Sequence, residues 1–378
     1  MASNRRNFII GAGGTLALVA AAGTWRVTRM PGTAIMPWKL DAEPPADVRL
    51  DAFRHAILAP NPHNRQPWLI RLEGSDSAII TCDLDKRLPE TDPFDRQITI
   101  GFGTFIELAR IAAAERGVRM DLAPFPEGEP QPRLDVRPVA HLTFTPDPSL
   151  KRDPLFTGIA ARRTNREVYD AQSPEPRQLA ALANEGVNLS ADAALMRKLR
   201  SISVAAITTE MTTQDKLMES VRLMRIGHDE IDANPDGIPL SGPMIETTAM
   251  LGLTSHESLA DQKSTSSKIG LDGLVKIYGS VPAVAWIVSA GNSRAEQLEA
   301  GRLYARANLR ATSMGLAMHP MSQALQEYPE MALHYAAIHA LLGVSGGARI
   351  QMLARVGLAL APAVDPAPRW PVETHILT

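Results

Sequence analysis

A loop rich in proline and amide side chains is the most informative segment of this 378-residue chain. It runs from Ala59 to Trp68 and reads Ala-Pro-Asn-Pro-His-Asn-Arg-Gln-Pro-Trp. The prolines restrict the backbone and lower the entropic cost of ordering the loop around a ligand. The amides supply donors and acceptors that match a flat polar ring and a hydroxylated chain. The plainer interpretation is a structural turn between a helix and a strand. The binding residues predicted here are Pro60, Asn61, Pro62, Asn64 and Gln66.

A dense group of arginines follows roughly a hundred residues later. The predicted site residues in it are Arg162, Arg163, Thr164 and Arg166. Planar guanidinium groups bind phosphate through paired, charge-assisted hydrogen bonds, and a hydroxyl can add another. Taken alone, the cluster is equally typical of a solvated basic turn. Flavin mononucleotide (FMN) is one ligand that needs both a phosphate site and an amide-bearing loop, so the pair together predicts a flavoprotein.

A third candidate lies near the C-terminus. Arg369 stands between Pro368 and Trp370, on a tail that proline stiffens. A guanidinium in such a place could complete a phosphate site, although by itself it is typical of a surface arginine.

Together these residues resemble the flavin-dependent nitroreductase family over most of the chain after residue 45. They are most similar to its Acg-like subgroup, in which two nitroreductase-like halves are fused. The family's Pro-Ser-x-x-Asn-x-Gln-Pro-Trp loop matches Pro60 to Trp68, with Asn61 in place of the serine. Its arginine cluster matches residues 162–166, and its terminal arginine matches Arg369. The family's lysine two positions before that arginine is Ala367 here.

The resemblance implies an α+β, three-layer nitroreductase-like fold whose two degenerate halves form a pseudo-dimer within one chain. The loop lies in the first half and the arginine cluster in the second, so we expect one composite FMN site and a monomeric chain. The turn that follows Gly315 resembles the family segment facing the reactive side of the flavin ring. Its predicted site residues are Pro320, Met321, Ser322 and Gln323. Glu-Gly is frequent in the family where this chain has Ser-Gln.

The activity implied by the resemblance is reduction of a nitroaromatic, a quinone or a similar small-molecule acceptor. NADPH and NADH are the candidate electron donors, and no side chain of this chain is assigned a catalytic role. An alternative is a protein that sequesters or stores FMN beneath a lid, with little turnover.

Composition and the N-terminal sequence indicate which partners and which cellular location to expect. The net charge of −2, from 39 basic and 41 acidic residues, gives no reason to expect a nucleic-acid partner. Cys82 is the single cysteine, so no internal disulfide can form. Arg5 and Arg6 precede a weakly apolar run that ends near Trp25 and predict a twin-arginine export signal. We therefore expect an exported protein, periplasmic or membrane-anchored facing outward, with the twin-arginine machinery as a partner.

Proline positions and apolar periodicity predict the elements that must place these residues. We expect an export segment (1–30), a linker (31–45), a first half (46–150) and a second half (151–378) with a lid at about 210–275. Predicted helices cover 47–58, 103–115, 177–184, 193–232 and 294–314. Predicted strands cover 68–72, 78–82, 134–144, 284–288 and 350–360. Residues 233–275 look polar and rich in turns.

A hydrolase is the remaining alternative. Gly343 to Gly347 matches the nucleophile-elbow pattern Gly-x-Ser-x-Gly, and Asp365 and His375 follow in the matching order. That motif needs a strand before it and a helix after it, whereas the sequence predicts the reverse. No metal-binding signature is present in the sequence.

Overall fold

The computed structural model describes residues 31–361 and 364–377. The predicted export signal lies outside these residues. Helices and antiparallel sheets share the described chain, which confirms the expected α+β class.

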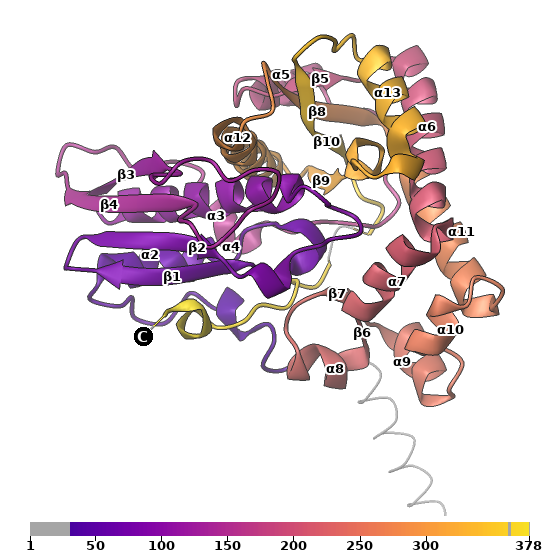
Figure 1. Ribbon diagram of the computed structural model, residues 1–378, viewed down its shortest axis with the longest axis horizontal. Helices are drawn as coiled ribbons and strands as arrows, with labels where there is room; N and C mark the ends of the chain where they lie inside the picture. Colours follow the sequence, from indigo (N-terminus) through magenta and orange to yellow (C-terminus); the bar gives the residue numbers. More distant parts are fainter. Residues whose placement is uncertain (1–30, 362–363, 378) are drawn as a thin grey trace, which may run out of the picture.

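The first sheet contains four antiparallel strands in the order β1-β2-β4-β3 (Figure 1). Its strands are β1 (Trp68–Glu73), β2 (Ser77–Cys82), β3 (Val118–Pro124) and β4 (Ala140–Pro146). Helices α2 (Val48–Ala56) and α3 (Arg96–Glu115) share its apolar core. Within this core Phe105 stacks on Phe53 at a centroid distance of 5.9 Å and on Trp68 at 4.7 Å. The core thereby anchors Trp68, the last residue of the proline and amide loop.

The second sheet has the same order of strands, β5-β8-β10-β9, and is antiparallel throughout. Its strands are β5 (Asn188–Ser190), β8 (Ala283–Ser289), β9 (Ala317–Pro320) and β10 (Arg349–Gly357). The helices around it are α4 (Gly158–Ala161), α5 (Pro176–Ala183), α12 (Arg294–Ser313) and α13 (Ala332–Leu341). In both sheets a long helix separates the second strand of the sheet from the third along the chain.

The two long helices α3 and α12 cross between the sheets (Figure 1). Gly103 of α3 and Gly301 of α12 meet at the crossing, where a Cβ on Gly103 would lie 2.0 Å from the Leu298 carbonyl oxygen. The first residues of the two helices reach across in both directions. Arg96 donates to the carbonyls of Leu325 and Gln351, each at 2.7 Å. Arg294 donates to the carbonyls of Pro130 (3.1 Å) and Pro132 (3.0 Å). The crossing therefore fixes the position of one sheet relative to the other.

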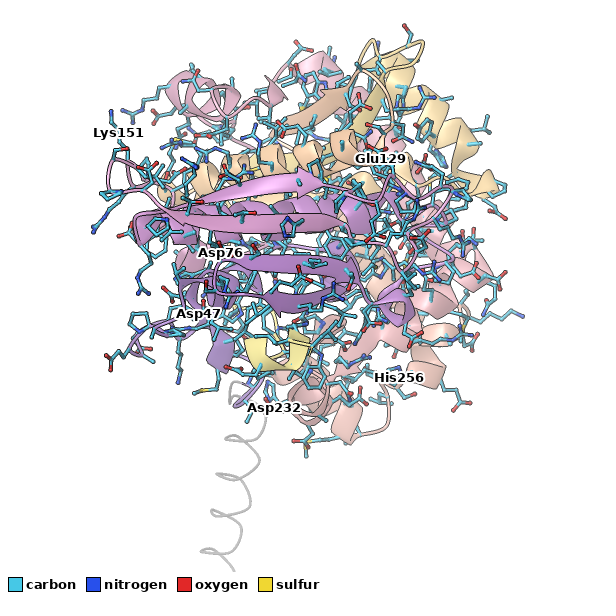
Figure 2. All side chains as sticks on the ribbon, turned by 60° about the vertical axis from the view of Figure 1, so that its left-hand side comes forward. Asp47, Asp76, Glu129, Lys151, Asp232 and His256 are labelled. Carbon is cyan, nitrogen blue, oxygen red and sulfur yellow. The ribbon has the colours of Figure 1, made fainter. Side chains whose placement is uncertain are left out.

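A helical segment joins β5 to β8 and runs down the right-hand side of Figure 1, from α6 at the top to α8, α9 and α10 at the bottom. It contains α6 (Ala193–Thr212), α7 (Gln214–Leu223), α8 (Gly227–Ala233), α9 (Pro243–Met250), α10 (His256–Ala260) and α11 (Thr265–Gly279). Two short parallel strands, β6 (Met224–Ile226) and β7 (Ile238–Leu240), interrupt it. Asp232 of α8, labelled in Figure 2, accepts the backbone N–H groups of Gly32, Thr33 and Ala34. The start of the described chain is thus tied to this segment.

The C-terminal tail returns to the first sheet. Residues 364–377 contain the short helix η6 (Val372–His375), and Ile376 forms a parallel bridge with Ile70 at the free edge of β1. The Leu377 N–H donates to the Ile70 carbonyl at 2.8 Å. Arg369 of this tail (drawn in yellow in Figure 1) donates to the Ile57 carbonyl at 2.6 Å, so the tail also contacts the end of helix α2.

Several element predictions need correction. Helix α3 begins seven residues before the predicted start, because Asp92 accepts the N–H groups of Gln97 (3.1 Å) and Ile98 (2.9 Å) and so caps the first turn. The β-branched residues Ile98 to Ile100 concealed that turn. Strand β3 was not predicted, and the strand predicted at 134–144 is β4, which begins at residue 140. Most of residues 243–279, expected to be turns up to 275, is helical, with Ser255 and Ser264 as N-caps.

The hydrolase alternative fails on local structure. Gly343 to Gly347 lies between α13 and β10, so a helix precedes the motif and a strand follows it. Gly343 has φ 69° and Gly346 φ 67°, which suits helix termination and a turn. The His375 Nδ1 lies 3.1 Å from the Trp68 carbonyl oxygen, so this histidine is engaged by strand β1.

Candidate functional site

Three guanidinium groups gather around one indole ring. Trp38 lies under Arg163 at 4.4 Å from the ring centroid, and under Arg369 and Arg162 at 5.5 and 5.7 Å. Its indole N–H donates to the Ala367 carbonyl at 2.7 Å, which fixes the ring. Stacking of this kind stabilises closely spaced cations through the ring quadrupole. Trp38 belongs to the short helix η1 (Met36–Trp38), within the segment that the sequence suggested was only a linker.

The arginine cluster lies against the entrance of the amide loop. Arg162 is 1% exposed, and its Nη2 donates to the Leu58 carbonyl at 3.0 Å. Arg369 is 2% exposed, and its Nη2 donates to the same carbonyl at 3.3 Å. Residues separated by hundreds of positions in sequence therefore meet at the end of helix α2, immediately before Pro60.

Unbalanced positive charge marks this junction. Burial, with a smaller contribution from the neighbouring Arg163, lowers the pKa of Arg162 to about 10. Burial also lowers the pKa of Arg369 well below its usual range, with Arg162 and Arg163 as further causes. The Nε of Arg162 is buried without a hydrogen-bond acceptor among the described residues. Asp365 opposes only the charge of Arg163. An anion at this place would relieve the repulsion and accept the free N–H group.

Arg369 uses its hydrogen-bond donors to position the loop. It donates to the backbone carbonyls of Ile57 (2.6 Å), Leu58, Ala59 (3.0 Å) and Pro368 (2.8 Å). It also donates to the side-chain oxygen of Asn64. All five N–H groups of a guanidinium are thus engaged. A direct contact with a phosphate would need some of these bonds to be exchanged.

The loop amides likewise hold the loop together. Asn61 accepts the Gln66 N–H at 2.8 Å and donates to the Ala59 carbonyl at 3.1 Å. The Asn64 amide donates to the Pro368 carbonyl at 2.9 Å. Gln66 accepts the Trp370 N–H at 3.0 Å. These bonds support a backbone in which Asn64 (φ 54°) and Gln66 (φ 51°) are left-handed, a conformation that costs of order 1 kcal/mol or more per residue.

Helix α3 carries the other side of the loop. The Thr104 hydroxyl donates to the Pro60 carbonyl at 2.6 Å. A Cβ on Gly101 would lie 3.2 Å from both Asn61 Cβ and Pro62 Cδ, so the loop packs closely on the helix. The conformation of all five predicted loop residues is therefore set by contacts with α3, the tail and the loop itself.

Arg166 differs from Arg162, Arg163 and Arg369 in that no donor of its guanidinium group is engaged by a described residue. It makes no hydrogen bond or ion pair with any described residue, and its side chain remains exposed. Desolvation by the neighbouring protein lowers the pKa of Arg166, and Tyr278 opposes this effect. Burial, Arg166 and Arg65 lower the pKa of His63 to about 4, and the His63 Nδ1 has no partner. Burial, Arg355 and Arg166 also hold His319 neutral by lowering its pKa. Arg166 thus links the loop to the second sheet.

The turn after β9 shows one accessible polar side chain. Met321 is a buried core residue, and its N–H donates to the Leu353 carbonyl at 2.8 Å. Ser322 is buried, with its hydroxyl 3.5 Å from the Met352 sulfur. Gln323 keeps intermediate exposure, and its Oε1 accepts the Tyr278 hydroxyl at 2.6 Å. Pro320, also partly exposed, closes strand β9. Gln323 is therefore the member of the turn best placed to meet a ligand.

A carboxylate fastens the helical segment to the loop. Asp236, between α8 and β7, contacts Arg225 at 2.6 Å, Lys86 at 2.8 Å and Arg65 at 3.4 Å. Burial raises its pKa, but Lys86 and Arg225 outweigh this effect and hold the pKa below the usual value. The next residue, Gly237, donates its N–H to the Asn64 carbonyl at 3.3 Å. The segment expected as a lid is thus attached directly to the amide loop.

The structure brings most of the predicted site residues into two neighbouring groups. The loop, Arg162, Arg163 and Arg369 meet around Trp38 and Leu58, and Thr164 adjoins Arg162 with an Oγ1–Nη1 distance of 3.4 Å. Arg166 approaches Tyr278, which in turn holds Gln323. Sequence reasoning missed Trp38, Tyr278 and His319. A tryptophan directly after Pro37 was a usable signal, whereas the other two carry no local signature.

The described residues contain neither a candidate metal site nor a helix that could span a membrane. Within residues 31–361 and 364–377, no three histidine, cysteine or acidic side chains are grouped so that they could hold a metal ion. Over the same residues, every helix is too short or too polar to cross a bilayer.

The chain matches no protein-family model. It is 26% identical over 342 residues to a Mycobacterium tuberculosis H37Rv protein named "Putative NAD(P)H nitroreductase Rv3131", covering 87% of this chain and 90% of that protein. It is 25% identical over 342 residues to "Putative NAD(P)H nitroreductase acg" of the same strain, covering 86% and 94%. A solved structure described as a "putative nitroreductase" from Anabaena variabilis aligns with a TM-score of 0.46 and 11% identity, covering 88% of this chain and 92% of that one. The two curated relatives confirm the resemblance to nitroreductases expected from the sequence.

Proposed function

We propose that this protein is an FMN-binding oxidoreductase of the nitroreductase type, with one composite flavin site per chain. One observation carries the proposal: Arg162 and Arg369 both donate to the Leu58 carbonyl, which brings the arginine cluster to the entrance of the amide loop. The names of the curated relatives agree with this activity.

The phosphate of FMN fits the junction around Trp38. Arg162 offers a buried, unpartnered Nε, and Arg163 and the Thr164 hydroxyl adjoin it. A dianion there would offset the like charges that lower the pKa values of Arg162 and Arg369. Arg369 would act chiefly through Asn64 and the loop backbone. We assign phosphate contact to Arg162, Arg163 and Thr164, and loop support to Arg369.

The ring would lie toward the second group of residues. Arg166 has free guanidinium donors, His63 has a free ring nitrogen, and Gln323 is partly exposed. When bound, FMN supplies electron transfer between a reduced nicotinamide and a nitroaromatic, quinone or similar acceptor. The protein residues orient the ligand, keep His63 and His319 neutral near pH 7, and restrict access of water.

A duplicated architecture supports the composite site. Both sheets have the same strand order, and three residues recur at a constant spacing of 198: Arg96 and Arg294, Gly103 and Gly301, and Gly117 and Gly315. We propose that the chain is a pseudo-dimer divided near residue 150, active as a monomer. The amide loop belongs to the first half and the arginine cluster to the second, so only one complete site forms.

We further propose export of this protein through the twin-arginine pathway, to the periplasm or the outer face of the inner membrane. The paired Arg5 and Arg6 before an apolar run support this address. Folding around FMN before export would suit such a route.

Comparison of FMN with riboflavin tests the phosphate assignment. Charge-assisted hydrogen bonds contribute about 1.5–3 kcal/mol each, so Arg162→Gln should weaken FMN binding by roughly 10-fold or more. Riboflavin, which lacks the phosphate, should be affected far less. Arg177→Gln is the matched control, because the Arg177 side chain is 82% exposed and forms a surface ion pair with Glu175. Equal losses for FMN and riboflavin, or no FMN binding by the native chain, would refute the assignment.

The lid attachment favours a second candidate function, FMN storage. Asp236 and Gly237 hold the helical segment against the amide loop, which could close the ring to a second substrate. Mixing the FMN-loaded protein with NADPH or NADH and a nitroaromatic separates the two functions. Sustained oxidation of the nicotinamide identifies the enzyme, whereas bound flavin without turnover identifies storage.

A further inference from the structure

A buried carboxyl group lies behind the turn that carries Gln323. Glu210 of α6 is 3% exposed, and within the part of the chain that the structure describes its Oε2 has no hydrogen-bond partner of normal geometry. The amides of Gln326 and Gln323 lie against this carboxyl group and act on its pKa. The Gln326 Oε1 is also buried without a partner. Two unpaired acceptors in one buried cluster are unfavourable unless one of them acquires a proton.

Glu210 decides which end of the Gln323 amide faces which neighbour. An ionised carboxylate can only accept hydrogen bonds, so it selects the NH₂ end of Gln323. The amide oxygen must then point the other way, where it accepts the Tyr278 hydroxyl at 2.6 Å. A protonated Glu210 carries an O–H donor and no longer imposes this choice. It can donate to an amide oxygen, either that of Gln326 or, after rotation of the amide, that of Gln323.

The surroundings keep Glu210 protonated to a much higher pH than an exposed glutamate. Burial raises the pKa of Glu210 to about 7, the two amides oppose this effect, and the charge of Glu219 on α7 adds to it. The other ionisable groups that face the cluster are Tyr278 on α11 and Tyr328 after η4 (Ser322–Leu325), and burial raises the pKa of both. Lys216 lies 5.1 Å from the Tyr328 ring centroid, and Arg166 faces Tyr278.

We propose that Glu210 is a positioning residue whose protonation sets the hydrogen-bonding character that Gln323 and Tyr278 present to the flavin site. The exchange involves one proton, taken from solvent onto Oε2 and returned to it, with no change in oxidation state. The effect on the flavin rests on the proposed function, whereas the protonation of Glu210 belongs to the protein alone.

The ligand-free protein provides the first test. A carboxyl group whose pKa is raised on folding favours the folded state below about pH 4.5, and this contribution is lost as the pH rises through about 7. Glu210→Gln, which mimics the neutral acid, should therefore gain stability relative to the native chain between pH 5 and pH 8, seen as a growing difference in unfolding midpoints. Glu330→Gln is the matched control, because Glu330 is exposed and also acts on Tyr328. A difference in unfolding midpoints that stays constant across this pH range would overturn the proposed protonation of Glu210.

The FMN-loaded protein provides the second test. The visible absorption spectrum of the native holoprotein should change with a midpoint near pH 7, and Glu210→Gln should lose that transition. Tyr278→Phe, which leaves Glu210 in place but removes the donor to Gln323, should shift the spectrum at both pH extremes. A transition retained in Glu210→Gln would overturn the proposal. If the chain binds no FMN, the proposed function fails by itself, and the unfolding experiment still decides the state of Glu210.

Discussion

Replacing Gly301 by alanine tests the helix crossing on which the proposed composite site depends. A Cβ at this position would lie 2.1 Å from the Ile100 carbonyl oxygen, 2.7 Å from Gly103 Cα and 2.9 Å from the Thr104 nitrogen. A carbon and a carbonyl oxygen normally approach no closer than about 3.3 Å, so helices α3 and α12 would have to separate by roughly 1 Å. All three obstructing atoms are backbone atoms, and no side-chain rotation can relieve the contact.

The magnitude follows from two opposing effects. Overpacking in a closely packed core costs about 1–3 kcal/mol, and more where backbone must move. Alanine recovers about 1 kcal/mol of helix propensity relative to glycine. Because the obstruction is entirely backbone, we expect a net loss of about 2 kcal/mol or more in the free energy of unfolding of Gly301→Ala. FMN affinity should fall as well, because α3 holds the amide loop through Thr104 and Gly101.

Urea unfolding monitored by circular dichroism, together with FMN titration, measures both effects. Gly270→Ala in α11 is the matched control: an added Cβ there meets no atom within 4 Å, so propensity alone should stabilise the protein by up to about 1 kcal/mol. If Gly301→Ala is as stable as Gly270→Ala, the two helices do not approach as closely as described, and the reasoning is refuted.

Three further changes have defined outcomes. Asp236→Asn should lower the free energy of unfolding by about 3–5 kcal/mol at pH 7, because it leaves Arg65 buried without its counter-charge. Limited proteolysis of this variant should then cleave first within residues 233–243. An unchanged digestion pattern would contradict the attachment of this segment to the amide loop. Burial lowers the pKa of His375 to about 4, so its stabilising contribution is present above about pH 6.5 and lost as the pH falls toward 4. Between pH 7 and pH 4, the free energy of unfolding of the native chain should fall by about 3 kcal/mol more than that of His375→Asn. Urea unfolding at each pH measures this difference. Burial raises the pKa of Cys82, so a thiol reagent should label it only at the rate of unfolding; rapid labelling of the folded chain would show an open site.

The sequence predicted local structure and chemistry where a residue type has one predominant role. Prolines 60, 62 and 67 predicted a stiff loop, and the clustered arginines predicted an anion site. Helix α12 was predicted nearly to its ends, because Ser293 caps it and Gly315 follows it. Helix α3 was predicted less well, because its cap is the Asp92 side chain four residues before the helix.

The tertiary structure decided what each polar group is used for. The sequence predicted that Arg369 and the loop amides contact a ligand. In the structure, Arg369 instead donates to the carbonyls of Ile57 to Ala59 and to Asn64, which lie more than 300 residues away in the sequence. The same long-range packing gives Trp38 its place beneath the arginines and leaves Arg166 with free donors. A sequence specifies which groups can donate or accept a hydrogen bond, whereas only the folded chain determines which of them are already paired and which remain free for a ligand.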